Sequence, residues 1–172
     1  LRYLLNQETD PAQRLLLVNH YLDDFRGTVF RQTMFAEFEK LIHAAAEDGQ
    51  ALSCRYFQDV YYQLNLDYFG PDMQVDQEID MEWSRIPHFY RAFYVYKYAT
   101  GMCAATALAQ NILSGDAEKV AAYIGFLSGG SSQSPLELLR GAGVDMESPK
   151  TLESAMQVFA DMLDELAALL QK

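Results

Sequence analysis

Apolar residues recur along most of the chain at the three- and four-residue spacing of amphipathic helices. The first run starts at Leu15 and Leu16 and continues to Leu41 and Ile42. No segment shows the alternation that is typical of a strand. The pattern predicts an all-α protein with helices over residues 11–48, 53–69, 89–113, 116–128, 135–140 and 149–170. In the last of these helices, the apolar stripe expected to face the core comprises Leu152, Met156, Phe159, Leu163, Leu166 and Leu170.

Short capping signals mark where several of these helices begin and end. Asp10 and Ser134 each offer a side-chain acceptor just before a proline that suits the first helical turn. Gly49 and Gly141 follow the last periodic residues of their helices and indicate C-terminal stops. Gly27 interrupts the first helix and indicates a bend there.

Residues 71–88 break the helical pattern. Prolines and aspartates are concentrated here, so we expect a loop, a short helix near Gln77–Trp83 and a turn at Ile86 and Pro87. Neither a Gly-rich linker nor an internal repeat divides the chain. Residues 1–172 are therefore predicted to form a single helical segment.

The chain of 172 residues is strongly acidic. It carries 13 Lys and Arg against 24 Asp and Glu, a formal net charge of −11 at pH 7. A field of that sign repels phosphate backbones and anionic lipid headgroups, and no apolar run approaches the roughly 20 residues of a membrane span. We therefore expect neither a nucleic-acid partner nor a membrane partner.

Two cysteines, Cys54 and Cys103, are too few for a disulfide scaffold and lack the spacing of a metal site. We expect both to be buried, reduced thiols in a cytoplasmic protein. The chain opens at Leu1 with apolar residues that look like the inside of a helix, and without an initiator Met or a signal-peptide pattern. This start indicates a piece of a longer protein.

The histidines give no metal motif. His20, His43 and His88 lie far apart in the sequence, and none belongs to His-Glu-x-x-His or Glu-x-x-His. His43 and Glu47 are one turn apart, but a pair at an acidic helix end is most often solvated. The chain also lacks a Gly-x-Ser-x-Gly elbow, and Gly129–Ser132 has the composition of an ordinary turn between helices.

Arg85–Gly101 is the unusual segment. It holds four of the eleven tyrosines within nine residues, next to His88. On a helix, Tyr90, Tyr94 and Tyr98 would share one face. Phenol and imidazole groups are good donors for a carbonyl or a developing oxyanion. The alternative, core packing with satisfied hydroxyl groups, stays open on spacing alone.

Five blocks of sequence carry a family resemblance. They follow one another in order over nearly the whole chain: Asn19–Glu39, Tyr68–Asp72, Trp83–Gly101, Pro135–Leu139 and Ala142–Met146. In these blocks the chain resembles the oligoendopeptidase F family of zinc metallopeptidases, the bacterial relatives of thimet oligopeptidase.

The resemblance implies the C-terminal part of a larger helical metalloendopeptidase that hydrolyses short peptides. In that family zinc sits on a His-Glu-x-x-His helix with a further Glu ligand, and both would lie N-terminal to Leu1. The partners implied are an oligopeptide substrate and the missing N-terminal part of the same enzyme. No zinc is expected in this chain alone, which should be inactive by itself.

The resemblance also implies site residues. Family members use a His and tyrosines downstream of the zinc helices to hold the substrate backbone and to stabilise the tetrahedral intermediate. The matching catalytic positions are His88, Tyr94 and Tyr96, and the matching substrate-binding positions are His88, Tyr90 and Tyr94. His88 ranks first, and several tyrosines compete for the second role.

Two other functions fit the sequence. One is a non-catalytic helical module that grips extended peptides through its tyrosines, and the other is an interaction domain with an acidic surface. The coding sequence upstream of Leu1 separates them from the peptidase: a His-Glu-x-x-His helix encoded there supports the enzyme, whereas a start codon near Leu1 supports a module.

Self-association is the first testable prediction. A segment taken from a larger helical body leaves apolar faces uncovered, with Leu1, Tyr3, Leu4 and Leu5 and parts of the tyrosine segment as candidates. We expect a dimer or a higher oligomer in analytical ultracentrifugation at high concentration. A strict monomer at millimolar concentration would contradict this expectation.

Overall fold

The computed structural model describes residues 2–171, which are helical apart from turns and loops and contain no strand. The all-α prediction is therefore confirmed. The chain divides into two compact units: residues up to Gly27 together with those from Thr100 onward form the first, and Thr28–Ala99 forms the second. The expectation that residues 1–172 are one segment of a single catalytic domain stays a prediction. No helix within residues 2–171 has both the length and the apolar character to cross a bilayer.

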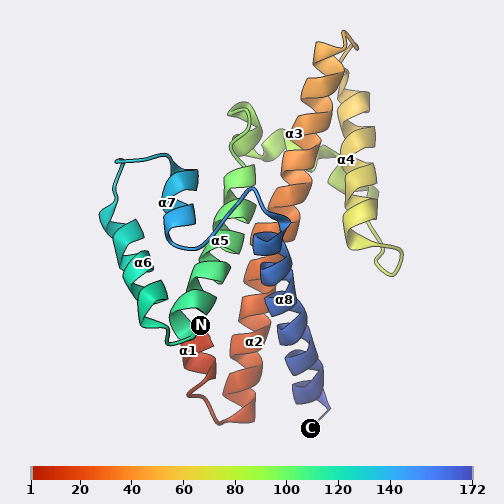
Figure 1. Ribbon diagram of the computed structural model, residues 1–172. Helices are drawn as coiled ribbons and strands as arrows, with labels where there is room; N and C mark the ends of the chain where they lie inside the picture. Colours follow the sequence, from red (N-terminus) through yellow and green to blue (C-terminus); the bar gives the residue numbers. More distant parts are fainter. Residues whose placement is uncertain (1, 172) are drawn as a thin grey trace. The chain divides into compact units, whose positions relative to one another are not determined.

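In the first unit, α2 (Pro11–Phe25) and α8 (Pro149–Leu170) run side by side in opposite directions (Figure 1). The Phe25 and Phe159 rings stack with their centroids 4.9 Å apart. Arg14 and Glu165 form an ion pair between the same two helices. Buried residues recur at three- and four-residue spacing along one face of each helix: Val18, Tyr21, Leu22 and Phe25 in α2, and Thr151, Ala155, Val158 and Met162 in α8.

The prediction that the apolar stripe of α8 faces the core holds only in part, because Met156, Phe159 and Leu166 are half-buried and the other three members are exposed. Leu152, Leu163 and Leu170 are 45%, 43% and 67% exposed, whereas Ala155 and Val158 are fully buried. Small side chains let two helices approach closely, so α8 turns Ala155 and Val158 inward and leaves Leu152, Leu163 and Leu170 outside. Hydrophobicity alone does not distinguish these two faces of the helix.

A second core of the first unit involves α5 (Tyr96–Leu113) beyond Thr100, α6 (Ala117–Ser128) and α7 (Pro135–Gly141). Gly129–Ser132 forms the turn between α6 and α7, as predicted. The core residues are Ala104, Leu108, Ala142 and Val144, with Ala107, Tyr123, Phe126, Leu139 and Met146 packed around them.

The second unit is built on the helix pair α3 (Arg31–Glu47) and α4 (Cys54–Phe69), with the 3₁₀-helix η2 (Gln77–Arg85) against α4 (Figure 1). Phe38 lies at the centre of its core: its ring is 5.2 Å from the ring of Tyr61 and 5.1 Å from that of Phe89. The fully buried members are Met34, Phe35, Phe38, Tyr61, Leu64 and Val95.

The single helix predicted over residues 11–48 is a succession of three elements. α2 ends at Phe25, the π-helix η1 (Arg26–Phe30) follows, and α3 starts at Arg31. A π-turn accommodates one extra residue. It occurs here around Gly27, whose missing side chain weakens an α-helix.

The helix predicted over 89–113 begins too early. Pro87–Tyr90 is instead a short 3₁₀-helix, η3, and α5 starts only at Tyr96. Between them Phe93 adopts a left-handed backbone conformation with φ 57°, which no α-helix can contain. The backbone N–H of Phe93 bonds to the Glu39 side chain instead of to a helical carbonyl. The face shared by Tyr90, Tyr94 and Tyr98 on one helix therefore does not exist.

Exposure corrects two further expectations. Cys103 is buried, as predicted, and burial raises its pKa, but Cys54 is exposed at the first turn of α4. At the N-terminal end Tyr3 and Leu4 are 62% and 52% exposed, in line with an uncovered apolar face, whereas Leu5 is buried. Leu1 lies outside the described residues.

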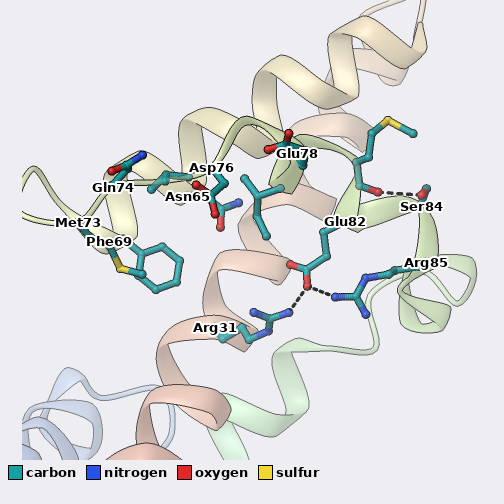
Figure 2. A pocket seen from close by; sticks show the side chains of 13 residues that line it. Arg31, Asn65, Phe69, Met73, Gln74, Asp76, Glu78, Glu82, Ser84 and Arg85 are labelled. Carbon is teal, nitrogen blue, oxygen red and sulfur yellow. Dashed lines mark hydrogen bonds and ion pairs between the residues drawn. The ribbon is translucent and has the colours of Figure 1, made fainter.

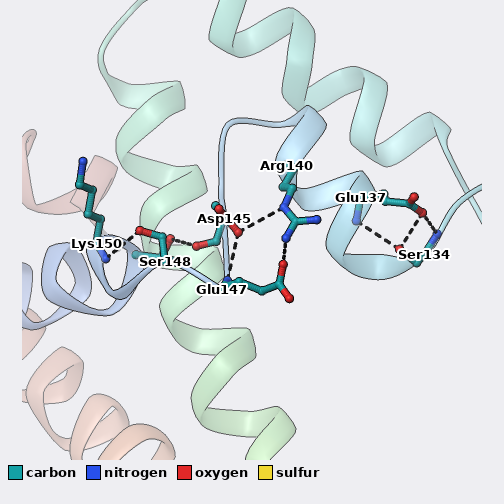
Figure 3. A network of polar contacts seen from close by, with 8 residues as sticks. Ser134, Glu137, Arg140, Asp145, Glu147, Ser148 and Lys150 are labelled. Atoms are coloured by element: carbon teal, nitrogen blue, oxygen red, sulfur yellow. Dashed lines mark hydrogen bonds and ion pairs between the residues drawn. The ribbon is translucent and has the colours of Figure 1, made fainter.

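α7 begins with a complete capping box (Figure 3). The Ser134 hydroxyl oxygen accepts from the backbone N–H of Glu137, and the Glu137 carboxylate accepts from the backbone N–H of Ser134 at 3.0 Å. The Ser134 hydroxyl also donates to that carboxylate at 2.7 Å. These bonds lower the pKa of Glu137 and fix the start of a helix of only seven residues. Arg140 in the same helix pairs with Asp145 and Glu147 after its end.

We expect Ser134→Ala to destabilise the chain by about 1 kcal/mol, because the hydroxyl supports both halves of the box. The midpoint of thermal unfolding should fall by about 2–4 °C. Ser131→Ala, in the preceding turn, is the matched control and should leave the midpoint unchanged. Equal midpoints for the two variants would show that the box contributes nothing.

The loss should also depend on pH. A carboxyl whose pKa is lowered by folding stabilises the native state above its unfolded pKa, and this stabilisation disappears as the pH falls through the folded value. The difference in unfolding midpoint between Ser134→Ala and the parent should therefore be larger at pH 7 than at about pH 3.

Candidate functional site

Three rings of the second unit form a cluster where the chain leaves η3 and enters α5. The His88 ring stacks on Tyr94 with centroids 5.6 Å apart, and Tyr98 lies edge-on to both, at 5.5 Å from His88 and 5.6 Å from Tyr94. His88 Nε2 and the Tyr98 hydroxyl share a hydrogen bond of 3.1 Å. One imidazole and two phenols thus point their polar atoms into one small region.

The cluster borders a hollow of about 230 Å³ lined by Pro87, His88, Arg91 and Tyr94. Tyr94 and Tyr98 remain 37% and 38% exposed, so both residues are open to solvent. Lys97 Nζ lies 5.2 Å from the centroid of the Tyr94 ring, which adds a positive charge to the acidic chain at this point.

The Tyr98 phenol of the cluster stays protonated at neutral pH. A side-chain hydrogen bond with Tyr94 is the main cause that raises the pKa of Tyr98, followed by desolvation. A protonated hydroxyl group can donate a hydrogen bond to the negative charge that develops on a bound carbonyl. Tyr98 can therefore offer a neutral donor to an oxyanion.

The structure brings together His88 and Tyr94 from the predicted set. It adds Tyr98, which sequence reasoning placed on the tyrosine face but not in the site. Tyr90 is 76% exposed and donates its hydroxyl to the backbone oxygen of Ser84 at 3.0 Å. Tyr96 opens α5 two residues before Tyr98, so the two side chains leave the helix about 200° apart. The four-residue spacing between Tyr94 and Tyr98 was the sequence signal that could have placed Tyr98 in the predicted site.

Within residues 2–171 no group of three or more His, Cys, Asp and Glu side chains could hold a metal ion. His20 pairs with Asp24 at 3.3 Å on the exposed surface of α2. His43 Nδ1 contacts the backbone oxygen of Glu39 at 2.7 Å, and its ring packs 4.6 Å from the ring of Phe93.

A larger cavity of about 610 Å³ lies elsewhere in the second unit, between α3, α4 and η2 (Figure 2). The Glu82 side chain is 5% exposed, and its Oε1 atom accepts from Arg31 and from Arg85, each at 2.6 Å. Its Oε2 atom accepts from the Tyr61 hydroxyl at 2.7 Å. Both arginines thus pair with one carboxylate, which binds η2 to α3 and α4.

The fold and the ring cluster define an all-helical segment that presents a histidine and tyrosines on an open surface. Residues 2–158 match the model of peptidase family M3. The chain belongs to this family, and the resemblance to oligoendopeptidase F that the sequence blocks indicated is confirmed.

The relatives are oligopeptidases. The chain is 55% identical over 170 residues to oligopeptidase PepF of Bacillus subtilis, covering 99% of this chain and 25% of that protein. It is 46% identical to the plasmid-encoded oligoendopeptidase F of Lactococcus lactis subsp. cremoris, covering 98% of this chain and 28% of that protein. The crystal structure of oligoendopeptidase-F from Enterococcus faecium superposes with a TM-score of 0.96 at 48% identity, covering 99% of this chain and 33% of that one. The chain thus spans about a quarter to a third of these relatives.

The buried Tyr61 hydroxyl gives a prediction for the stability of the second unit. Burial, and then the bond to Glu82, raises the pKa of Tyr61, so the phenol stays a donor at every working pH. Tyr61→Phe leaves one Glu82 oxygen without this donor and should cost about 1–3 kcal/mol in the free energy of unfolding.

The neighbouring Tyr62 supplies the control. Its hydroxyl makes a longer bond of 3.4 Å to the backbone oxygen of Val75. Tyr62→Phe should therefore cost less in denaturant unfolding. A loss for Tyr61→Phe no larger than for Tyr62→Phe would show that the Glu82 network does not stabilise the unit.

Proposed function

We propose that this chain is part of a metalloendopeptidase of the oligoendopeptidase F type, which hydrolyses short peptides in the cytoplasm. The chain contributes the His and Tyr groups that hold the substrate and stabilise the oxyanion. The observation that carries the proposal is the cluster of His88, Tyr94 and Tyr98 beside an open hollow. Family membership supports the reaction class, and the names of the relatives, oligopeptidase and oligoendopeptidase, support the substrate class.

The cluster suits a peptide carbonyl. When Tyr98 donates to His88 Nε2, the imidazole carries its proton on Nδ1, and when His88 donates, Nε2 carries it. In both cases the shared bond fixes the orientation of the ring. The hydroxyl group of Tyr94, whose ring stacks on His88, can donate a hydrogen bond to the peptide carbonyl oxygen. Donors fixed before the reaction stabilise charge that grows in the transition state without further reorganisation.

Tyr90 and Tyr96 take supporting parts in the proposal. Tyr90 is the most exposed of the four tyrosines, next to Arg91 on the hollow, and is proposed to contact substrate. Tyr96 competes with Tyr94 for the oxyanion. Its place on α5, opposite Tyr98, ranks it below Tyr94.

Zinc is the metal that the resemblance implies for the complete enzyme. The side chains of residues 2–171 do not fit it, because no group of three or more ligating residues comes together there. No reaction step is therefore derived through the metal. The residues of this chain bind and orient peptide and supply hydrogen bonds to its carbonyl.

A non-catalytic peptide-binding module is the second candidate. The same hollow and the same donors could grip a peptide backbone without cleaving it. The candidates differ in what His88 does: in a peptidase its loss slows turnover, whereas in a binding module its loss weakens affinity alone.

His88→Ala in the full-length protein tests the peptidase proposal. We expect kcat for peptide hydrolysis to fall about 100- to 1000-fold, with a smaller change in KM, because the lost donor acts mainly on the transition state. Tyr94→Phe should lower kcat more than Tyr96→Phe. Peptide hydrolysis and thermal unfolding are measured side by side.

His20→Ala is the matched control, since His20 is an exposed histidine whose ion pair lies within α2. It should keep normal turnover. If His88→Ala lowers the melting point steeply while the folded enzyme keeps near-normal turnover, His88 is structural and the site assignment is wrong.

A further inference from the structure

Phe93 occupies an unusual conformation at the entrance to the ring cluster. Among residues 2–171 it is the one non-glycine residue with a positive φ, at 57°. A bulky aromatic side chain disfavours this region because its Cβ crowds the following carbonyl oxygen. The Phe93 side chain is 52% exposed, so burial of its ring does not account for the conformation.

The hydrogen bond that holds this conformation comes from α3. The Oε1 atom of Glu39 accepts from the backbone N–H of Phe93 at 2.9 Å, across 54 residues of sequence. Glu39 is 1% exposed and lies on the face of α3 that also buries Phe35 and Phe38. A polar group buried on such a face needs a hydrogen-bond partner, and the Phe93 N–H supplies it.

His43, one helical turn after Glu39 in α3, also contacts Phe93. Its Nδ1 atom contacts the Glu39 backbone oxygen at 2.7 Å, and its ring lies 4.6 Å from the Phe93 ring. α3 thus contacts Phe93 at its backbone through Glu39 and at its side chain through His43.

The conformation of Phe93 decides where the next two residues go. Tyr94 stacks on His88, and Val95 is fully buried in the core of the second unit. We propose that Glu39 is a positioning residue for the peptidase site: by holding Phe93 in the left-handed conformation, it sets the Tyr94 ring against His88. This inference rests on the proposed function and deepens it.

The length and the charge of the side chain at position 39 can be changed separately. Glu39→Gln keeps the length of the side chain and an oxygen acceptor but removes the charge, whereas Glu39→Asp keeps the charge and shortens the side chain by one methylene. If the hydrogen bond to Phe93 is what matters, Glu39→Gln of the full-length protein should keep kcat within about 5-fold. Glu39→Asp should lower it by about 10- to 100-fold with KM nearly unchanged, since misplacing a reacting group by an ångström costs on the order of 100-fold.

Glu37 provides the matched control on the same helix. Its carboxylate accepts from the Tyr68 hydroxyl at 2.8 Å, away from the cluster. Glu37→Asp and Glu37→Gln should both keep normal kcat. Phe93→Gly gives a rescue arm, because glycine takes a positive φ without steric cost. In the Phe93→Gly background, Glu39→Asp should cost less than in the parent.

The outcomes separate the two proposals. If His88→Ala keeps full turnover, the proposed function fails whatever Glu39 does. If His88→Ala loses turnover but Glu39→Asp retains it, or if Glu39→Gln loses more than Glu39→Asp, the positioning role is wrong. An unfolded Glu39→Asp protein also overturns it, because a side chain whose loss of one methylene unfolds the chain is structural.

Discussion

Residues 71–95 form no α-helix. Their place in the second unit depends on two buried carboxylates, one within the segment at Glu82 and one outside it at Glu39. Glu82, within η2, accepts from Arg31 of α3 and Tyr61 of α4. Glu39, within α3, accepts from the backbone of Phe93. Regular helices satisfy their own backbone groups, whereas an irregular segment needs outside partners for its polar atoms. Glu82 and Glu39 are such partners, and both are buried beside the core around Phe38.

The same division explains which elements could be predicted from the sequence. The starts of α2, α4, α6, α7 and α8 follow local signals, since each N-cap side chain bonds to a backbone N–H two or three residues later. The start of α5 has no such local signal. It follows the left-handed Phe93, whose backbone N–H bonds to Glu39, a residue 54 positions away, and an unbroken run of helix-compatible residues hid the interruption. The buried face of α8 was missed in part for a related reason, because α2 selects it and the local sequence does not.

The candidate site was predictable in composition but not in geometry. His88 and Tyr94 were identified through a resemblance to known peptidases, and the structure places them in contact. The helical face proposed for the tyrosines was wrong, yet Tyr94 and Tyr98 still meet, because the turn at Phe93 returns Tyr94 to the first turn of α5. A 3₁₀-helix, a left-handed residue and an α-helix produce this arrangement together. The periodic spacing of apolar residues does not encode such a succession of backbone conformations.

The different surroundings of the two cysteines have a practical consequence. Cys54 is exposed at the start of α4, while Cys103 is buried with a raised pKa and therefore stays a protonated, unreactive thiol at neutral pH. A maleimide dye or a spin label added to the unmodified chain should attach at a single known position. The second unit thus carries a natural attachment point for fluorescence or electron paramagnetic resonance, without mutagenesis and more than thirty residues in sequence from the ring cluster.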